Sequence, residues 1–118
     1  MERFPEIDDP ISNIIWVDAM SLNPNNYNPN VVFLAELRTL ENNILKFGWV
    51  HPLLVSKAGT IIDGFHRWCL ATKSELMIER YRKRVPVSRL DISESDAKIL
   101  TIGINRAKGT HIAVKMSQ

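Results

Sequence analysis

Residues 60–68 combine the residue types that could hold an anionic ligand. The run Thr-Ile-Ile-Asp-Gly-Phe-His-Arg-Trp starts with β-branched residues, turns at Asp63-Gly64, and places His66 and Arg67 directly afterwards. This order predicts a strand that turns at the glycine and opens a helix. The first turn of a helix has backbone N–H groups without intrahelical partners, and Arg67 adds a fork of donors that matches two phosphate oxygens. The stretch therefore predicts a phosphate site, most simply for a nucleotide.

Asp63 leaves two interpretations open. A carboxylate beside a phosphate is repelled unless it binds a divalent cation or takes up a proton. Asp63 is thus a candidate Mg²⁺ ligand and a candidate catalytic residue. The alternative is that it only forms the turn, in which case the whole stretch would be a structural Asp-Gly turn with a surface His-Arg pair.

Four stretches rich in β-formers predict the strands that position this corner. They are residues 13–22, 52–55, 60–63 and 85–87. The second and third are joined by a turn at Lys57-Ala58-Gly59 and predict a hairpin. Pro86 lies inside the last stretch, which places that strand at a sheet edge.

Apolar residues at three- and four-residue steps predict three helices. They cover residues 31–47, about 66–77, and 93 to about 107. Gly48 and Gly109 are the expected residues that end the first and the last helix. Ser93 followed by Asp96 is a variant of the capping box at the start of the third.

Length and composition fit one small domain, and the predicted strands and helices make it an α+β domain. The chain has 118 residues, a net charge of +2, 45% hydrophobic residues and 24% charged residues, which is ordinary for a single globular core. We expect an N-terminal arm at residues 1–12 and one domain at 13–118. The first residues lack the apolar run of a signal peptide and no stretch has the length of a membrane span, so a cytoplasmic protein is expected. Cys69 is the only cysteine, which excludes an intrachain disulfide and predicts a buried structural thiol.

Three sequence blocks resemble the ParB N-terminal family, which is also called the ParB-like nuclease domain. Residues 45–55, Leu-Lys-Phe-Gly-Trp-Val-His-Pro-Leu-Leu-Val, resemble its helix-to-strand block, and residues 62–71 resemble its phosphate box. Sulfiredoxins share that box as Gly-Cys-His-Arg, and a family of serine kinases has Asp-Gly-His-His-Arg. Ile104-Asn105-Arg106 resembles the Asn-x-x-Arg helix of the family, although Asn and Arg are adjacent here. The resemblance covers about residues 14–111, and the stand-alone size is similar to that of small ParB-like proteins from phages.

The resemblance implies a ParB/sulfiredoxin-like fold, a small mixed sheet packed against about three helices. It implies that Gly64, Phe65, His66 and Arg67 hold the phosphates of a nucleoside triphosphate, CTP or ATP, with Mg²⁺ as a candidate cofactor. It would also aim Asn105 and Arg106 at the nucleotide. Phe65 replaces the sulfiredoxin cysteine, so sulfinic acid reduction would have no nucleophile.

Three functions remain open at this stage. The first is a nucleotide-binding module in DNA-related or regulatory processes, acting with DNA, a DNA-binding partner protein or a second copy of itself. The second is an enzyme of the same fold, a phosphotransferase, nucleotide hydrolase or nuclease. The third is a DNA-binding module without nucleotide, which would use a run of basic residues. The candidate nucleic-acid contacts in that run are Arg80, Arg82, Lys83 and Arg84.

Overall fold

The computed structural model describes residues 5–25 and 34–116, with side-chain surroundings as far as residue 107. It contains a four-stranded mixed sheet in the order β1-β4-β2-β3. The strands are β1 (Ile14–Asp18), β2 (Leu53–Ser56), β3 (Ile61–Asp63) and β4 (Arg84–Leu90). β4 runs antiparallel to β1 and parallel to β2, and β2 and β3 form the predicted antiparallel hairpin.

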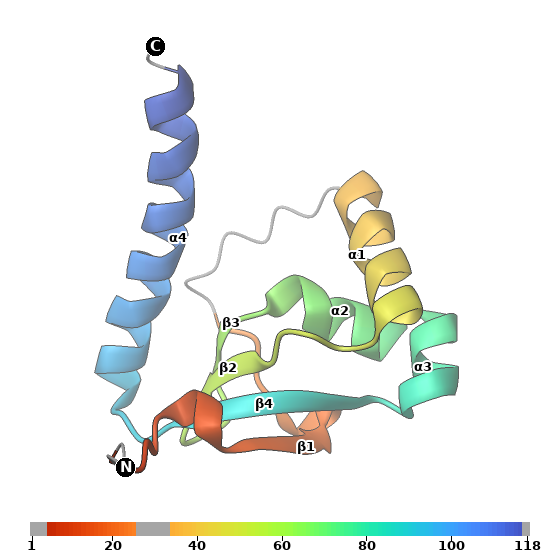
Figure 1. Cartoon of the computed structure of the whole chain (residues 1–118), viewed down its shortest axis with the longest axis horizontal. Helices are drawn as coiled ribbons and strands as arrows, with labels where there is room; N and C mark the ends of the chain where they lie inside the picture. Colours follow the sequence, from red (N-terminus) through yellow and green to blue (C-terminus); the bar gives the residue numbers. More distant parts are fainter. Residues whose placement is uncertain (1–4, 26–33, 117–118) are drawn as a thin grey trace, which may run out of the picture.

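Four α-helices accompany the sheet, with short 3-10 helices η1 (Pro10–Ser12) and η2 (Ala19–Ser21) on either side of β1. They are α1 (Leu34–Phe47), α2 (Phe65–Lys73), α3 (Glu75–Tyr81) and α4 (Glu94–Met116). Figure 1 shows α1, α2 and α3 grouped on one side and α4 standing apart at the other end of the sheet. The α+β class and the small mixed sheet are confirmed.

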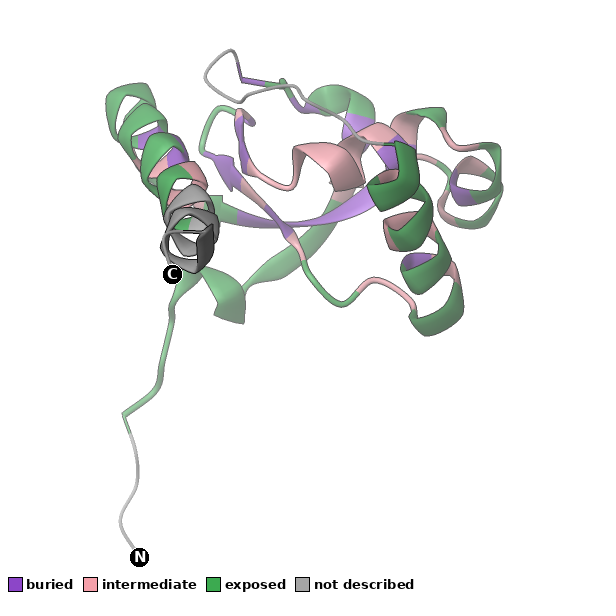
Figure 2. Cartoon of the chain, turned by 90° about the horizontal axis from the view of Figure 1, so that it is seen from above, coloured by how far each residue is buried: buried purple, intermediate pink, exposed green. Residues whose placement is uncertain are grey.

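The core lies between the sheet and α2. Leu53, Val55, Ile61, Val85 and Val87 from the strands are fully buried, and Ala71 of α2 packs against them. A second cluster of Ile44, Leu70 and Met77 joins α1, α2 and α3. Figure 2 shows that buried positions concentrate on the inner strands, whereas β1 remains exposed at the edge. The corner at Gly64 is therefore built on the best-packed part of the molecule.

The edge position predicted for the proline-containing strand is wrong. β4 is an inner strand with β1 on one side and β2 on the other. Its pairing with β2 begins at Val87, opposite Leu53, whereas Pro86 pairs only with Trp16 of β1. A proline is tolerated here because it precedes the pairing with β2, so β4 has a single neighbour at that residue.

Two helix boundaries also differ from the prediction. The single helix expected at about 66–77 is two helices, because Ser74 has an extended backbone, with φ −77° and ψ 122°, and its hydroxyl accepts from the Met77 N–H at 3.3 Å. The last helix continues through Gly109 to Met116. A glycine inside a helix weakens it by only about 1 kcal/mol and does not have to end it. The strand expected at 13–22 stops at Asp18, whose side chain accepts from the Met20 N–H and starts η2.

Candidate functional site

Gly64 forms the corner between β3 and α2 in a conformation that requires glycine. Its φ is +103° and its ψ is 21°, a region that other residues rarely adopt. A Cβ here would lie 2.9 Å from Leu53 Cγ and 3.3 Å from Nη2 of Arg67. The backbone therefore approaches both β2 and the Arg67 guanidinium as closely as it can.

Trp68 fixes the start of α2 against the rest of the domain. Its indole Nε1 donates to the Ala19 carbonyl at 2.8 Å, and its backbone N–H donates to the Gly64 carbonyl at 2.9 Å. The ring of Phe65 stacks on that of Trp68, with centroids 5.9 Å apart, and the His66 ring lies 6.0 Å from Phe65. Phe65 thus packs against its aromatic neighbours at the start of α2.

The first turn of α2 presents the donors predicted from the sequence. Gly64 is its N-cap and offers no side chain to cap the amides of Phe65, His66 and Arg67, and no acidic residue lies in the turn. The positive end of the helix dipole lies at the same place. An anion placed before this turn would meet backbone N–H groups and the two basic side chains.

Arg67 is the side chain of the corner with the most distinctive surroundings. It is half-buried, and its Nε is a buried donor without a hydrogen-bond partner in the described part of the chain. Burial lowers the pKa of Arg67, and the nearby Asp63 carboxylate raises it in part. A guanidinium remains charged at neutral pH in such surroundings. Arg67 is thus a confined cation, that is, a half-buried guanidinium with the Asp63 carboxylate nearby. Its Nε–H donor has no acceptor among the described residues.

A pocket of about 340 Å³ adjoins Arg67, which forms part of its wall. The volume lies within the range of small-molecule sites, roughly 300–1,000 Å³. Trp49 also lines the pocket, and its Nε1, like Nε of Arg67, is buried without a partner among the described residues. The complete lining is Leu40, Asn43, Ile44, Phe47, Gly48, Trp49, Val50, His51 and Arg67. An apolar, partly aromatic hollow beside a phosphate-type corner suits the less polar part of a ligand.

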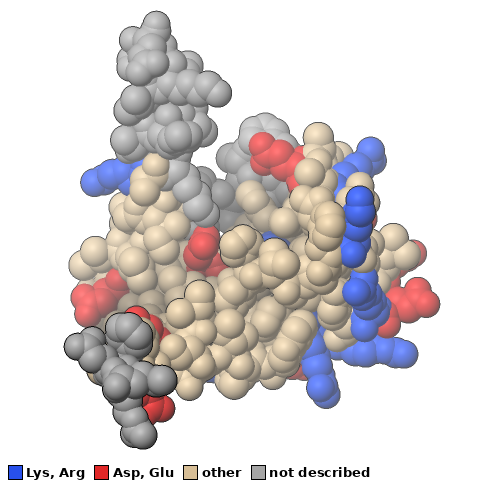
Figure 3. Space-filling view, in the orientation of Figure 1, with Lys and Arg blue, Asp and Glu red and all other residues tan. Residues whose placement is uncertain are grey.

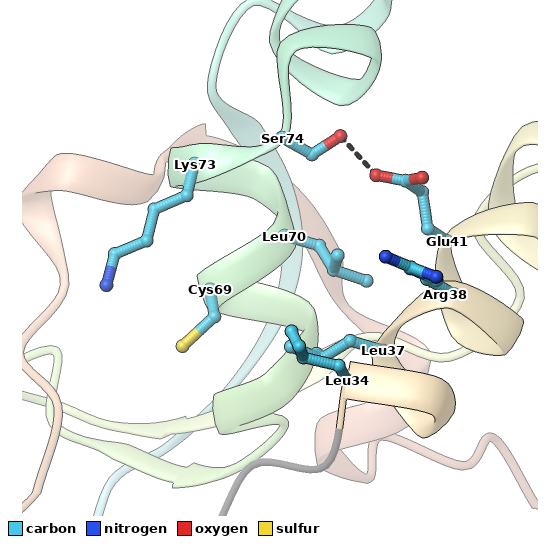
Figure 4. Close-up of a pocket in the computed structure, with 8 residues that line it drawn as sticks. All are labelled: Leu34, Leu37, Arg38, Glu41, Cys69, Leu70, Lys73 and Ser74. Carbon is cyan, nitrogen blue, oxygen red and sulfur yellow. Dashed lines mark hydrogen bonds between the residues drawn. The ribbon is translucent and has the colours of Figure 1, made fainter.

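A second pocket, of about 310 Å³, lies between α1 and α2 (Figure 4). It is lined by Leu34, Leu37, Arg38, Glu41, Cys69, Leu70, Lys73 and Ser74. The hydroxyl of Ser74 donates to Glu41, which gives that carboxylate a structural role. Arg38 and Lys73 lie at opposite sides of Leu70 and do not converge on one point (Figure 4). This pocket is therefore a poorer anion site than the corner.

Cys69 lines this second pocket instead of lying fully in the core. It is half-buried, whereas Ala71 two residues later is 1% exposed. Burial raises the pKa of the Cys69 thiol, and the charge of Lys73 lowers it in part. The expectation of a fully buried thiol is thus only partly met.

The other predicted site residues lie on α4 or outside the described part of the chain. Asn105 is half-buried and Arg106 is exposed on the part of α4 that follows Thr101. α4 packs on β3, away from α1 and α3 (Figure 1). The run 23–30 is rich in Asn and Pro, and its position made Asn26 and Tyr27 candidate contacts to the base or ribose; both lie outside the described residues. Among the described residues, no three His, Cys, Asp or Glu side chains form a group that could hold a metal ion, so Asp63 would need phosphate oxygens as further ligands.

Asn25 is a structural residue that the sequence did not single out. It is 5% exposed, and its amide donates to the Ile61 carbonyl at 2.8 Å and to Thr101 Oγ1 at 3.0 Å. Thr101 in turn donates to the Ala97 carbonyl at 2.8 Å. Asn25 thus links the Asn-rich segment, β3 and α4. Only its place in an Asn-Pro run pointed to it, and that run does not show which asparagine is buried.

Comparisons by sequence find one curated relative of this chain among those considered. No protein-family model matches the chain. The uncharacterised protein YbdM of Escherichia coli K12 is 33% identical over 118 residues, 97% of this chain and 56% of YbdM. The chain therefore spans little more than half the length of this curated relative. Within the described residues, no helix is both long and apolar enough for a membrane span.

Two solved structures share the fold. The chromosome-partitioning protein ParB of Caulobacter crescentus, C-terminally truncated and complexed with CTP-γ-S, superposes with a TM-score of 0.62 at 23% identity, covering 79% of this chain and 52% of that chain. A Pnob8-like ParB N-domain gives a TM-score of 0.57 at 17% identity over 75% of this chain and 34% of that chain. The chain therefore has the ParB N-terminal domain fold, as its three sequence blocks predicted.

Proposed function

We propose that this chain is a nucleotide-binding module whose Gly64–Arg67 corner holds the phosphates of a nucleoside triphosphate. The observation that carries the proposal is Arg67, a confined guanidinium with an unused buried donor at the open start of α2. An oxyanion is the ligand that would use this donor together with the amides of the first turn. The similar ParB of Caulobacter crescentus was crystallised with a CTP analogue, which supports CTP as the first nucleotide to test.

Each corner residue has a separate task in this proposal. Gly64 lets the backbone approach the ligand, the amides of Phe65 and His66 donate to phosphate oxygens, and Arg67 binds two of them. The pocket beside Trp49 would take the base or the sugar. Binding would bias a surface that DNA or a partner protein reads, which makes the module a switch in a DNA-related or regulatory process.

Asp63 determines whether the module is a switch or a catalyst. Its carboxylate lies close enough to Arg67 to influence that side chain's pKa. Beside bound phosphates this carboxylate would be repelled unless it helped to hold a divalent cation such as Mg²⁺. Asp63 together with the phosphate oxygens would hold the ion, which would supply Lewis-acid chemistry for hydrolysis of the triphosphate to the diphosphate and inorganic phosphate. A nuclease would need more carboxylates than the described part of the chain brings together.

Titration calorimetry with CTP, ATP and ADP, each with and without Mg²⁺, tests the proposal. Arg67→Ala should abolish binding, and Arg67→Lys should weaken it by about tenfold or more, because a point charge replaces a bidentate fork. Arg38→Ala is the matched control, since it removes a cation at the rim of the second pocket. If Arg38→Ala removes binding and Arg67→Ala does not, the corner is the wrong site.

A phosphate-release assay separates the switch from the catalyst. Release of inorganic phosphate by the wild type, lost in Asp63→Asn with binding retained, would establish hydrolysis at this residue. Binding without release over hours would leave the switch as the function. If none of the three nucleotides binds with or without Mg²⁺, both versions of the proposal fail.

A further inference from the structure

Trp16, Trp49 and Tyr81 form an aromatic cluster at the end of the sheet away from α4. The rings of Trp16 and Tyr81 are stacked, with centroids 6.0 Å apart and an interplanar angle of 13°. Trp49 meets both at steep angles, at 6.5 Å from Trp16 and 6.1 Å from Tyr81. The cluster joins β1, the segment before β2 and the end of α3.

Trp16 is half exposed although it belongs to this cluster. Its exposed fraction is 50%, a large value for a tryptophan within a strand. β1 is one of the two edge strands, and no described strand pairs with its outer side. Tyr81 stacks against one face of the Trp16 ring, so the exposure comes from the rest of the ring. A flat, rigidly supported aromatic surface at an open edge is a stacking platform without a partner in the described chain.

Basic side chains surround this platform. Arg80 places its guanidinium carbon 5.1 Å from the Tyr81 ring centroid and donates to the Leu45 carbonyl. The next residues are Arg82, Lys83 and Arg84, with Arg82 and Arg84 exposed. None of these cations lies within 4 Å of a described carboxylate. Figure 3 shows lysine and arginine side chains along the side of the molecule that carries α1 and α3.

Carboxylates near the platform are few and partly engaged. Asp18 is the register partner of Arg84, but its carboxylate accepts the Met20 N–H and starts η2. Glu79 lies on α3, one residue before Arg80. The segment from Arg80 to Arg84 itself carries four positive charges and no negative one, so the net local charge favours a polyanion.

The turn that presents these cations is strained. Arg82 has φ +57° and Lys83 has φ +61°, the only positive φ values among non-glycine residues in the described chain. Each such residue costs roughly 1 kcal/mol or more, which glycine or asparagine would avoid. The turn therefore holds two cations where glycine would give a more stable protein. Two cations at these strained positions have a physical reason if their charges bind an anionic ligand.

We propose that Trp16, Tyr81 and the Arg80–Arg84 segment form a binding surface for a single-stranded nucleic acid. A base would stack on the exposed ring of Trp16, and phosphates would follow Arg82, Lys83 and Arg84. A duplex hides the faces of its bases and would leave Trp16 unused. An acidic protein would pair with the cations but gain little from an aromatic ring of this kind. The surface does not include Gly64 to Arg67, although Trp49 contacts Trp16 and Tyr81 and also lines the pocket beside Arg67.

Fluorescence anisotropy of labelled oligonucleotides tests the surface. An unstructured DNA 20-mer and its RNA counterpart should bind more tightly than a duplex of the same length. Trp16→Leu, which retains apolar packing, should weaken binding by about tenfold or more, whereas Trp16→Phe should keep most of it. Lys57→Ala, which removes an exposed cation at the opposite end of β4, should leave the affinity for the single strand unchanged.

The double variant Arg82→Gly/Lys83→Gly separates function from structure. It relieves two strained residues, so its Tm should equal or exceed that of the wild type. It should also lower the slope of log affinity against log salt by about 1.4, since each lost phosphate contact contributes about 0.7 for single strands. Loss of stability without loss of binding would show that the turn is structural and overturn the proposal. Equal binding of duplex, or heparin binding that ignores Trp16→Leu, would also overturn it, because the surface would then attract any polyanion or acidic protein.

Discussion

Replacing Gly64 with alanine should destabilise the domain by more than its backbone angle alone explains. A residue with a Cβ in the left-handed region costs about 1–2 kcal/mol. The new methyl would also lie 2.9 Å from Leu53 Cγ, and Leu53 is fully buried and cannot move aside. Overpacking of this kind costs roughly another 1–3 kcal/mol. The total is about 3 kcal/mol, which lowers the Tm of a domain of this size by about 12 °C.

Gly48→Ala provides the matched control for this change. Gly48 ends α1 with φ +86°, and a Cβ there would have no atom within 4 Å. It should therefore cost only the backbone term, about 1 kcal/mol. Urea unfolding of the two variants and the wild type gives both values on one scale. Equal losses in the two variants would refute the close approach of Gly64 to β2 and, with it, the shape derived for the corner.

Three further changes test other parts of the structure. Asn25→Ala should cost about 2–3 kcal/mol in urea unfolding, because it leaves the Ile61 carbonyl and Thr101 hydroxyl buried with fewer partners; a double-mutant cycle with Thr101→Val should give a coupling clearly above zero, and additive losses would contradict the bond. The stability of the wild type should fall as the pH rises above the ordinary pKa of a thiol, since burial raises the pKa of Cys69 and the unfolded chain ionises first. Cys69→Ala should lack this fall, and an unchanged pH profile would disprove the assignment. Ser93→Ala should cost about 1 kcal/mol, because Ser93 Oγ accepts the Asp96 N–H at 3.1 Å; a thermal melt indistinguishable from wild type would show that this cap contributes nothing.

The sequence predicts the structure correctly where the conformation depends on residues that are close together in the chain. Gly48 has the positive φ expected of the residue after a helix, and its N–H donates to the Ile44 carbonyl at 2.7 Å. Ser93 caps α4 as its spacing to Asp96 predicted. The turn at Gly64 was also predictable, because a β-branched run followed by Asp-Gly permits few backbone paths. In each case a few consecutive residues determine the conformation.

The predictions were wrong where contacts between residues far apart in the sequence determine the structure. Pro86 indicates an edge, but the strand order depends on which segments come to lie beside β4, and the register with β2 makes the proline acceptable. Ser74 interrupts an apolar pattern that continues across it, so the pattern predicted one helix in place of two. Gly109 could either end a helix or lie inside one, and its own type does not decide.

The site was predictable to the extent that it is contiguous in sequence. The order of Gly64, His66 and Arg67 identified the corner, but the pocket beside it comes from α1 and the segment before β2. Trp49, which lies between α1 and β2, and Arg67 of α2 come to line one pocket only in the folded chain. The candidates on α4, Asn105 and Arg106, were chosen by resemblance alone, and they stay a prediction.

Asp63 and Arg67 together determine how the corner would respond to a ligand. Arg67 is partly removed from water, and the Asp63 carboxylate offsets part of the resulting cost. A bound phosphate would become the anion nearest to Arg67. It would then lie beside the Asp63 carboxylate, and the two negative groups would repel each other. The repulsion disappears if a divalent cation bridges the two, or if the carboxylate is replaced by an amide. Nucleotide affinity should therefore depend strongly on Mg²⁺ in the wild type and much less in Asp63→Asn, as the same calorimetric titrations would measure. Equal Mg²⁺ dependence in both proteins would mean that Asp63 only shapes the turn.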